Sequence, residues 1–414
     1  MDTPFFSIII PTRNRYETLK YAILTVLIQD YKSFELIISD NSDEEYLSRI
    51  EVISECLSDV RIKYHRPSTV LSMSDNWEYA VSKSTGEYLI IFGDDDGLVA
   101  NSLSKIFKII QKTKAELINW ARIEYSWPDR LPSQYSNLTI IPYMGKTGVV
   151  NSIDYINRVI HQKADYRYLP MFYNSAVRRE TVELLKKLTG RVFNAWSPDI
   201  YTGYAFAHLV KKFITVSYPF SINGVSARSN GAAFLNSDEL KQAEYLTLLK
   251  ESNIKWPAAL PEINTSYIGI IEPFLQLTKH FPEMGQYISR KEIYKIIIDT
   301  VESSSKSDLE HKINTIVESS KNDLVLYNWL IKYVAKVKPV FKPPIIVSLI
   351  DKVGLDGFHI YLDASKFGLR NVYDVSFFIN NIFGELKDQD YFKPVRLSLV
   401  TRIRKAIGMI IRPA

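Results

Sequence analysis

The sequence predicts an α/β fold with an open, mostly parallel sheet, followed by a mainly helical C-terminal region. Three nearly continuous apolar runs occupy residues 6–10, 34–39 and 88–92, and runs without alternation are typical of strands buried on both faces. Helical patterns separate these runs, which favours a parallel sheet. From about residue 236 helical patterns dominate. Ligands of such sheets bind at the carboxyl ends of the strands.

The helices of the first half are predicted from apolar residues at helical spacing. In the first helix, Leu19, Ile23 and Val26 fall on one face. Helices are expected over residues 16–28, 45–57, 76–83 and 98–110. Farther along, the residues predict a strand over 117–123, a loop rich in Pro and Ser over 127–142, helices over 178–188 and 200–210, and a short strand over 213–217.

The change of pattern near residue 236 predicts two domains, residues 1–235 and residues 236–414. The helical stretches of the second domain are residues 240–249, 293–302 and 324–334. Hinges are expected at residues 303–305 and 339–344, which are rich in Ser and in Pro, respectively.

Composition excludes several classes of protein. The net charge of +5 over 414 residues is too small, without a clustered patch, to imply nucleic acid as a partner. The single cysteine, Cys56, excludes an intramolecular disulfide and a multi-cysteine zinc site. The N-terminus lacks a signal-sequence pattern, and no run of 18 apolar residues exists. We therefore expect a cytoplasmic protein.

Three consecutive carboxylates, Asp94, Asp95 and Asp96, directly follow the apolar run of residues 88–93. Like charges this close disfavour one another's ionised form unless a cation neutralises them, and carboxylate oxygens suit Mg²⁺ or Mn²⁺. An acidic turn that caps the following helix fits the same residues. Other polar residues also follow predicted strands, namely Thr12 and Asn14 after the first and residues 40–42 after the second. These loops should meet at one edge of the sheet and form a site.

Together these segments resemble the nucleotide-sugar-binding half of glycosyltransferase family 2, over about residues 5–220. The resemblance implies the GT-A fold, with a Rossmann-like central sheet flanked by helices, and inverting transfer of a sugar from a nucleoside-diphosphate sugar, most often a UDP-sugar. The segments that carry the resemblance are Ser-Ile-Ile-Ile-Pro-Thr-Arg-Asn-Arg at 7–15, Ile-Ile-Ser-Asp-Asn-Ser at 37–42, Gly-Glu-Tyr at 86–88, and Asp-Asp-Asp at 94–96.

The resemblance implies that a set of strand-end residues binds the nucleotide. Asp40 would accept a hydrogen bond from a ring N–H of the base, although an Asx turn also explains an Asp there. Arg13 and Arg15 would help to hold the diphosphate, or are exposed residues at a helix start. The implied nucleotide-binding residues are Pro11, Thr12, Arg13, Asn14, Asp40, Asn76, Asp94 and Asp95.

Residues Asp75-Asn76-Trp77 stand where relatives often carry Ala-Arg-Asn, so a cation near the nucleotide is missing. The family's acidic motif usually reads Asp-x-Asp-Asp, and Gly93 takes its first position here. We expect Asp94 and Asp96 to bind Mn²⁺ or Mg²⁺, with Asp95 as an alternative ligand. The cation would bridge the two phosphates and stabilise the departing nucleoside diphosphate.

An inverting displacement also needs a base that takes the proton from the acceptor hydroxyl. The candidate is Asp199, at a position where relatives commonly carry Glu-Asp before a helix and this chain carries Pro198-Asp199. Pro and Asp are also natural first-turn residues of a helix, so a capping role stays open. His208, on the same helix, is expected to be a packed histidine rather than a ligand.

Residues 393–414 contain six basic residues and no acidic one, with Leu399, Ile403, Ile407 and Ile410 at helical spacing. Such basic amphipathic helices lie on anionic membranes, each basic group contributing on the order of 1 kcal/mol. A helix packed on the core is the alternative. Membrane contact would place the protein on the inner face of the plasma membrane, with a glycan or lipid-linked glycan acceptor, as in relatives that build O-antigen or capsule.

The sequence therefore predicts a metal-dependent inverting glycosyltransferase of surface-polysaccharide synthesis. The Gln-x-x-Arg-Trp signature of processive synthases is absent, which favours single additions. A sugar nucleotidyltransferase is disfavoured because residues 11–14 lack a glycine-rich phosphate loop. The remaining alternative is a catalytically inactive sugar-nucleotide-binding or scaffolding protein, which the departures at Gly93 and Pro198 would suit.

Overall fold

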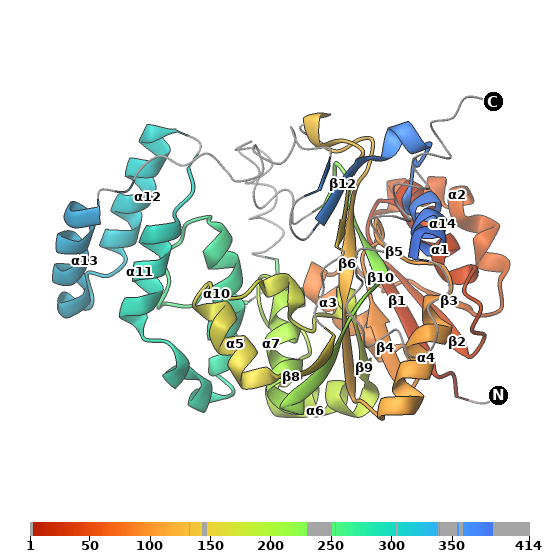
Figure 1. Cartoon of the computed structure of the whole chain (residues 1–414), viewed down its shortest axis with the longest axis horizontal. Helices are drawn as coiled ribbons and strands as arrows, with labels where there is room; N and C mark the ends of the chain where they lie inside the picture. The colour runs from red at the N-terminus through yellow and green to blue at the C-terminus, as the bar shows by residue number, and fades with distance from the viewer. Residues whose placement is uncertain are drawn as a thin grey trace.

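The computed structural model describes residues 3–131, 133–142, 147–229, 251–252, 254–303, 305–337, 339, 354–355 and 359–383. Within these residues a twelve-stranded mixed sheet forms the centre of the molecule, with helices on both of its faces (Figure 1). An apolar core fills each side of the sheet. The predicted α/β class with a helical C-terminal part is confirmed.

The parallel half of the sheet has the order β3-β2-β1-β4. The first two strands and β4 are buried along their whole length, as their unalternating apolar runs predict. The pairing of Thr12 with Asp40 sets the carboxyl ends of β1 and β2 side by side. These strands are β1 (Phe6–Thr12), β2 (Phe34–Asp40), β3 (Ile62–His65) and β4 (Tyr88–Ile91).

The other half of the sheet is mixed. Strand β9 joins β4 to β6 through antiparallel pairs, and β10 runs parallel to β6 with a register irregularity between Val216 and Ser221. The predicted loop at 127–142 is partly wrong, because its last residues form β7, in which Thr139 and Ile141 are buried. The strands are β5 (Gly97–Leu98), β6 (Leu117–Ser126), β7 (Leu138–Pro142), β8 (Gly148–Asn151), β9 (Ser175–Arg178) and β10 (Lys212–Val225).

The helices follow the predicted order, with three differences, one of which is α5 (Ser152–Ile160), a helix that was not predicted. The predicted helix at 45–57 is broken into η1 (Glu44–Arg49), α2 (Glu51–Ser54) and η2 (Cys56–Ser58), since few of its residues have a core to face. The helix predicted from residue 98 begins at Ser102 because Leu98 pairs in β5. The other helices are α1 (Tyr16–Leu27), α3 (Met73–Ser82), α4 (Ser102–Thr113), α5 (Ser152–Ile160), α6 (Arg179–Thr189) and α7 (Pro198–Val210), with 3-10 turns η3 (Ser133–Tyr135), η4 (Tyr166–Tyr168) and η5 (Phe172–Asn174).

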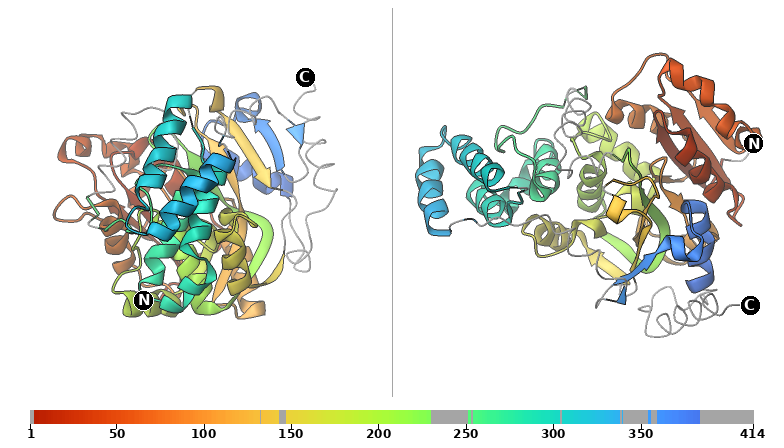
Figure 2. Two further views of the ribbon diagram at one scale, coloured as in Figure 1. Left: turned by 90° about the vertical axis from the view of Figure 1, so that its left-hand side faces the viewer. Right: turned by 90° about the horizontal axis from the view of Figure 1, so that it is seen from above.

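The helical C-terminal part extends away from the sheet, on the side opposite β3 (Figure 2). The first of its helices within the described residues, α10, packs on α7. None of the described helices is long and apolar enough to cross a lipid bilayer. The elements are α10 (Ser266–Thr278), η6 (Pro282–Tyr287), α11 (Arg290–Thr300), α12 (Lys306–Glu318) and α13 (Leu324–Val337). The predicted helix at 240–249, the domain boundary at 235, most of the hinge at 339–344 and the basic segment at 393–414 lie outside the described residues.

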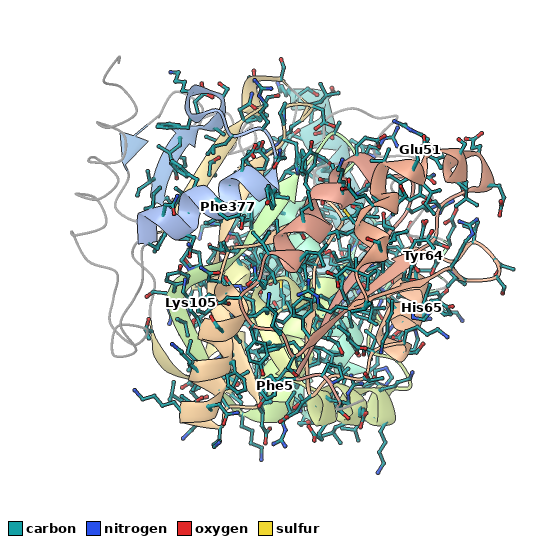
Figure 3. The ribbon with its side chains drawn as sticks, turned by 90° about the vertical axis from the view of Figure 1, so that its right-hand side faces the viewer. Phe5, Glu51, Tyr64, His65, Lys105 and Phe377 are labelled. Atoms are coloured by element: carbon teal, nitrogen blue, oxygen red, sulfur yellow. The ribbon has the colours of Figure 1, made fainter. Side chains whose placement is uncertain are left out.

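The chain then returns to the first domain. Strand β12 (His359–Asp363) pairs with β7 and with β11 (Gly354–Leu355), and after η8 (Ala364–Phe367) the helix α14 (Val372–Phe383) packs on α1. Lys105 of α4 fixes α14, because its Nζ donates to Asn380 Oδ1 at 3.2 Å and to the Tyr218 hydroxyl at 2.8 Å (Figure 3). Residues 359–383 therefore pack against the central sheet and α1.

Candidate active site

The acidic turn at residues 94–96 connects β4 to β5 and is buried. Asp94 Oδ2 accepts a hydrogen bond of 2.6 Å from Thr12 Oγ1, and its Oδ1 pairs with Arg15 Nη1 at 3.1 Å. Burial raises the pKa of Asp94, the Arg15 charge opposes that shift, and Asp95 adds to it. The structure thus brings the loop after β1 onto the acidic turn, as the sheet order predicts.

The other two carboxylates of the turn bind the end of β10. Asp96 accepts backbone N–H bonds of 2.7 Å from Gly93 and from Gly224. Burial, followed by the neighbouring charge of Asp95, raises the pKa of Asp96 to about 8. Asp95 Oδ2 accepts from Ser226 Oγ at 2.7 Å and from the Ser229 hydroxyl. The loop that follows β10 therefore closes over the turn.

The fit of a divalent cation can be judged from the oxygens of this turn. Within the described residues no group of three or more His, Cys, Asp or Glu side chains could hold a metal by itself. Asp94 and Asp96 accept hydrogen bonds on both of their oxygens, whereas Asp95 Oδ1 accepts none from a described residue. Mg²⁺ commonly takes one or two carboxylates and completes its shell with water and substrate phosphates. The turn therefore fits a cation that water and substrate phosphates help to coordinate. It does not form a site in which the protein supplies every ligand.

Asp40, the predicted base contact, is fully buried at the end of β2. Its Oδ2 accepts from the hydroxyls of Tyr16 at 2.6 Å and Tyr64 at 2.5 Å, and its Oδ1 accepts from the Ser42 amide at 2.9 Å. Burial and the bond to Asp40 raise the pKa of Tyr16 to about 12. Tyr64, on β3 (Figure 3), covers the carboxylate. A direct base contact by Asp40, which stays a prediction, would need Tyr64 to move.

Asn76 lies beneath the end of β2 rather than at an open edge. Its Oδ1 accepts from Ser39 Oγ at 2.6 Å and its Nδ2 donates to the Ser39 carbonyl at 3.3 Å. The neighbouring Asp75 pairs with Arg191 Nη2 at 2.6 Å. Arg191, between α6 and α7, therefore supplies a cation beside the position where the sequence lacks one. This pair could not be predicted from the sequence, because Asp75 and Arg191 are far apart in the chain.

The loop after β1 is tied to the loop after β2. Asn14 has a positive φ of 60°, a conformation that Asn tolerates better than most residues. Its amide donates to Ser42 Oγ at 2.8 Å and its Nδ2 donates to Asp43 at 2.6 Å, while Arg13 pairs with Asp43 at 3.3 Å. Pro11 is buried opposite Ser39 in the ladder. These bonds hold Pro11, Arg13 and Asn14 at one edge, near Thr12 and Asp94.

Asp199 is the second residue of α7, directly after Pro198, and is partly exposed. Burial raises the pKa of Asp199, and the charge of Arg122 opposes this shift. Burial raises the pKa of the Tyr173 hydroxyl of η5, and the charges of Asp199, Asp96 and Asp95 raise it further. His208, in contrast, packs on Phe281 and lies 3.2 Å from Glu283.

The segment before Asp199 is held by Glu272, a buried residue of α10 that the sequence analysis missed. Glu272 Oε2 accepts from the Trp196 amide at 3.2 Å, and its Oε1 accepts from Gln276 Nε2 at 2.7 Å. Burial raises the pKa of Glu272 to about 7. The helical part of the chain therefore positions the start of α7.

We expect the substitution Glu272→Gln to remove a pH dependence of stability. Because the folded-state pKa of about 7 lies above the unfolded value, stability is greatest below the unfolded pKa and is lost as the pH rises through 7. Relative to Glu272→Gln, the wild type should lose about 3 kcal/mol of unfolding free energy between pH 4 and pH 8. Urea denaturation of both proteins across this pH range measures the difference. Unfolding free energies that change in parallel with pH in the wild type and in Glu272→Gln would contradict the raised pKa of Glu272.

Part of the chain matches a known protein family. Residues 7–186 match the family model "Glycosyl transferase family 2". The GalNAc(5)-diNAcBac-PP-undecaprenol beta-1,3-glucosyltransferase of Campylobacter jejuni is 30% identical over 123 residues, which cover 29% of this chain and 39% of that protein. A protein of Escherichia coli K12 named for glycosyl transfer in colanic acid biosynthesis is 28% identical over 141 residues, covering 34% of this chain and 50% of its own length. The chain thus spans half or less of these relatives.

Two solved structures are also similar. Staphylococcus aureus TarS 1-349 in complex with UDP-GlcNAc has 12% identity and a TM-score of 0.46, covering 81% of this chain and 93% of that one. The mannosyltransferase PcManGT of Pyrobaculum calidifontis, in complex with GDP-Man and Mn²⁺, has 15% identity and a TM-score of 0.40, covering 82% and 88%. Residues 7–186 thus resemble a glycosyl transferase family 2 domain, and the parallel β3-β2-β1-β4 order with the acidic turn after β4 belongs to a GT-A fold.

Proposed function

We propose that the protein is a metal-dependent inverting glycosyltransferase, which moves a sugar from a nucleoside-diphosphate sugar to an acceptor hydroxyl. The observation that carries the proposal is the buried acidic turn after β4, where Asp94 accepts a hydrogen bond from Thr12 and pairs with Arg15. A donor anchored at the turn would present its sugar toward Asp199. The family match of residues 7–186 supports the same chemistry.

The donor would lie along the edge formed by β1, β2 and β4. Thr12, Arg13, Asn14 and Asp94 meet there through direct hydrogen bonds or shared loops, with Pro11, Asp40 and Asn76 behind them. A UDP-sugar is the favoured donor on the family resemblance. Arg15, paired with Asp94, would also face the diphosphate. Anion binding by a charged side chain at a loop edge is a common way to hold a diphosphate.

A Mn²⁺ or Mg²⁺ ion would be held by the acidic turn, through Asp94 and Asp96 with Asp95 as the alternative ligand. The Asp95 Oδ1 atom accepts no hydrogen bond from a described residue, which favours Asp95 as one of the metal ligands. When bound, the ion would neutralise charge on the departing diphosphate. Asp199 would take the proton of the acceptor hydroxyl as its oxygen attacks the anomeric carbon, and the bond to the diphosphate oxygen would break with its electron pair. A single displacement of this kind inverts the configuration.

The acceptor is proposed to be a glycan or lipid-linked glycan of a surface polysaccharide such as O-antigen or capsule. The Campylobacter relative, named for a substrate on undecaprenyl diphosphate, supports this class of acceptor. Contact of residues 393–414 with the inner face of the plasma membrane would bring the site to such an acceptor. The part of the chain from residue 236 onward would contribute to acceptor binding, because α10 packs on the helix that carries Asp199.

Thermal-shift measurements with a panel of nucleoside-diphosphate sugars, with and without Mn²⁺, test the proposal. One donor should raise the melting temperature of the wild type by several degrees, because ligands that bind only the folded state stabilise it by mass action. Asp96→Ala and Asp95→Asn should weaken the response that depends on Mn²⁺. Two variants are needed because Asp96 also holds the turn through Gly93 and Gly224. If no donor shifts the wild type, the inactive scaffolding protein becomes the better account.

A further inference from the structure

Helix α13 presents an apolar surface that the candidate active site does not use. Leu324, Val325 and Ile331 are 70%, 83% and 45% exposed, respectively. Single exposed apolar side chains are common, but several on one face mark a contact with a protein, a ligand or a membrane. Helix α13 lies at the end of the described helical part, away from the sheet (Figures 1 and 2).

The other side of α13 packs on α11 and α12. Leu326 and Leu330, four residues apart, are buried on that side. Because the helix has 3.6 residues per turn, the exposed apolar residues fall on the opposite side, together with three polar residues. All six side chains of this outward face are exposed, namely Leu324, Val325, Asn328, Ile331, Lys332 and Lys336.

The charge of the outward face is positive. Lys332 and Lys336 are exposed, and neither forms an ion pair with a described residue. Helix α13 contains no acidic residue, and Asp323, which precedes it, lies 3.7 Å from Arg290 Nη1. Exposed apolar side chains beside unpaired cations are typical of a surface that binds anionic lipid.

Aromatic side chains lie between the outward face and the packed side. Trp329 and Tyr333 are partly exposed and stack with ring centroids 4.8 Å apart. The Tyr333 hydroxyl donates to Asp299 Oδ1 at 2.6 Å, and Lys295 Nζ donates to Asp299 Oδ2 at 2.6 Å, so this carboxylate of α11 is already paired. Trp and Tyr are enriched at membrane surfaces, where one end of the side chain is in an apolar medium and the other in water.

Helix α13 has 14 residues and is about 21 Å long, shorter than the roughly 30 Å of a bilayer's hydrocarbon core. We propose that its outward face docks on the surface of an anionic lipid bilayer. The three exposed apolar side chains would enter the headgroup region, and Lys332 and Lys336 would contact lipid phosphates. A second copy of the chain is a weaker fit, because this face has no acidic side chain to pair with another copy's lysines.

This inference goes beyond the proposed function and does not depend on it, because docking on a bilayer needs neither donor nor metal. It also concerns a different part of the chain from residues 393–414. Because α13 lies away from the sheet, a bilayer on its outward face would not cover the acidic turn after β4 (Figure 1).

Co-sedimentation of the full chain with vesicles tests the inference. One set of vesicles is phosphatidylcholine alone, and the other is equal parts phosphatidylcholine and phosphatidylglycerol. The wild type should bind the mixed vesicles about tenfold more tightly or better, because each lysine near an anionic surface adds about fivefold to the affinity. Two double variants, Leu324→Asp with Val325→Asp and Lys332→Gln with Lys336→Gln, should each lower that affinity about tenfold or more.

Helix α6 supplies matched control variants. Its exposed leucines and lysines share their surface with Glu180 and Glu183, so this helix is not expected to bind anionic lipid. The controls make the same chemical changes, as Leu184→Asp with Leu188→Asp and Lys186→Gln with Lys187→Gln. They should leave vesicle binding within about twofold of the wild type.

No binding of the wild type to mixed vesicles would overturn the inference, as would α13 variants that bind as the α6 controls do. Sedimentation velocity tests the other occupant. A wild-type dimer that the α13 variants convert to a monomer, with vesicle binding unchanged, would assign the face to a second copy and also overturn the inference. Thermal melts check folding, and the donor-dependent thermal shift of the same variants without vesicles should equal that of the wild type, so the proposed function is tested separately.

Discussion

Replacement of Asp199 by Asn is expected to lower turnover by about 100- to 10,000-fold while donor affinity stays within about twofold, because a general base contributes on that scale to the chemical step. The substitution keeps the size of the side chain and its place in the first turn of α7. The expected signature is a loss of kcat with little change in the KM for the donor. Release of nucleoside diphosphate in the presence of acceptor measures both.

The control for this variant is Asp154→Asn, which changes an exposed first-turn Asp of α5. It should leave turnover unchanged. Because burial raises the pKa of Asp199, and the base must be ionised, wild-type kcat should fall with decreasing pH at a higher pH than an ordinary carboxyl would give. Full turnover by Asp199→Asn would show that another group removes the proton, or that the helix start is only structural.

Gly224→Ala is expected to be among the most destabilising single substitutions in the first domain. A Cβ at residue 224 would lie 1.7 Å from the carbonyl oxygen of Asp95, which is backbone and cannot turn away. Either β10 or the acidic turn must shift, and the bonds from Gly224 and Ser226 to the turn would be lost. We expect a loss of about 3 kcal/mol or more of unfolding free energy, together with loss of donor binding.

Gly285→Ala provides the matched control, because no atom lies within 4 Å of the added Cβ. It should change the unfolding free energy by less than about 1 kcal/mol. Guanidinium denaturation of the two variants and the wild type measures the difference. Equal midpoints for Gly224→Ala and the wild type would mean that β10 does not approach the turn as closely as the structure places it.

Local pattern was enough to predict much of the parallel half of the sheet. Strands β1, β2 and β4 contain nearly continuous apolar runs, and polar residues end β1 and β2 and follow β4 at residues 94–96. Both the strands and the shared edge of Thr12 and Asp94 therefore follow from neighbours in sequence. The break in the helix predicted at 45–57 could not be foreseen, because it depends on which residues find a core. The pairing of β12 with β7 and the packing of α14 on α1 were not predicted either, because they also depend on tertiary contacts.

The residues that complete the site come from distant parts of the chain. Gly224 lies near the end of β10, Ser226 follows that strand, and Glu272 comes from α10. None carries a local signal, since each acts through a partner that only tertiary packing supplies. The hydrogen bond from the Tyr64 hydroxyl to the Asp40 carboxylate also has no local signal, because Tyr64 lies on the neighbouring strand β3.

The anomalous signal of manganese, in crystals grown with Mn²⁺ and the donor selected by thermal shift, would show where the metal and the donor bind. We expect a manganese peak about 2 Å from a carboxylate oxygen of residues 94–96 and from phosphate oxygens of the donor, with the sugar on the side of Asp199. A donor bound elsewhere, or a donor bound at this edge with no manganese at the acidic turn, would contradict the proposed metal-dependent transfer.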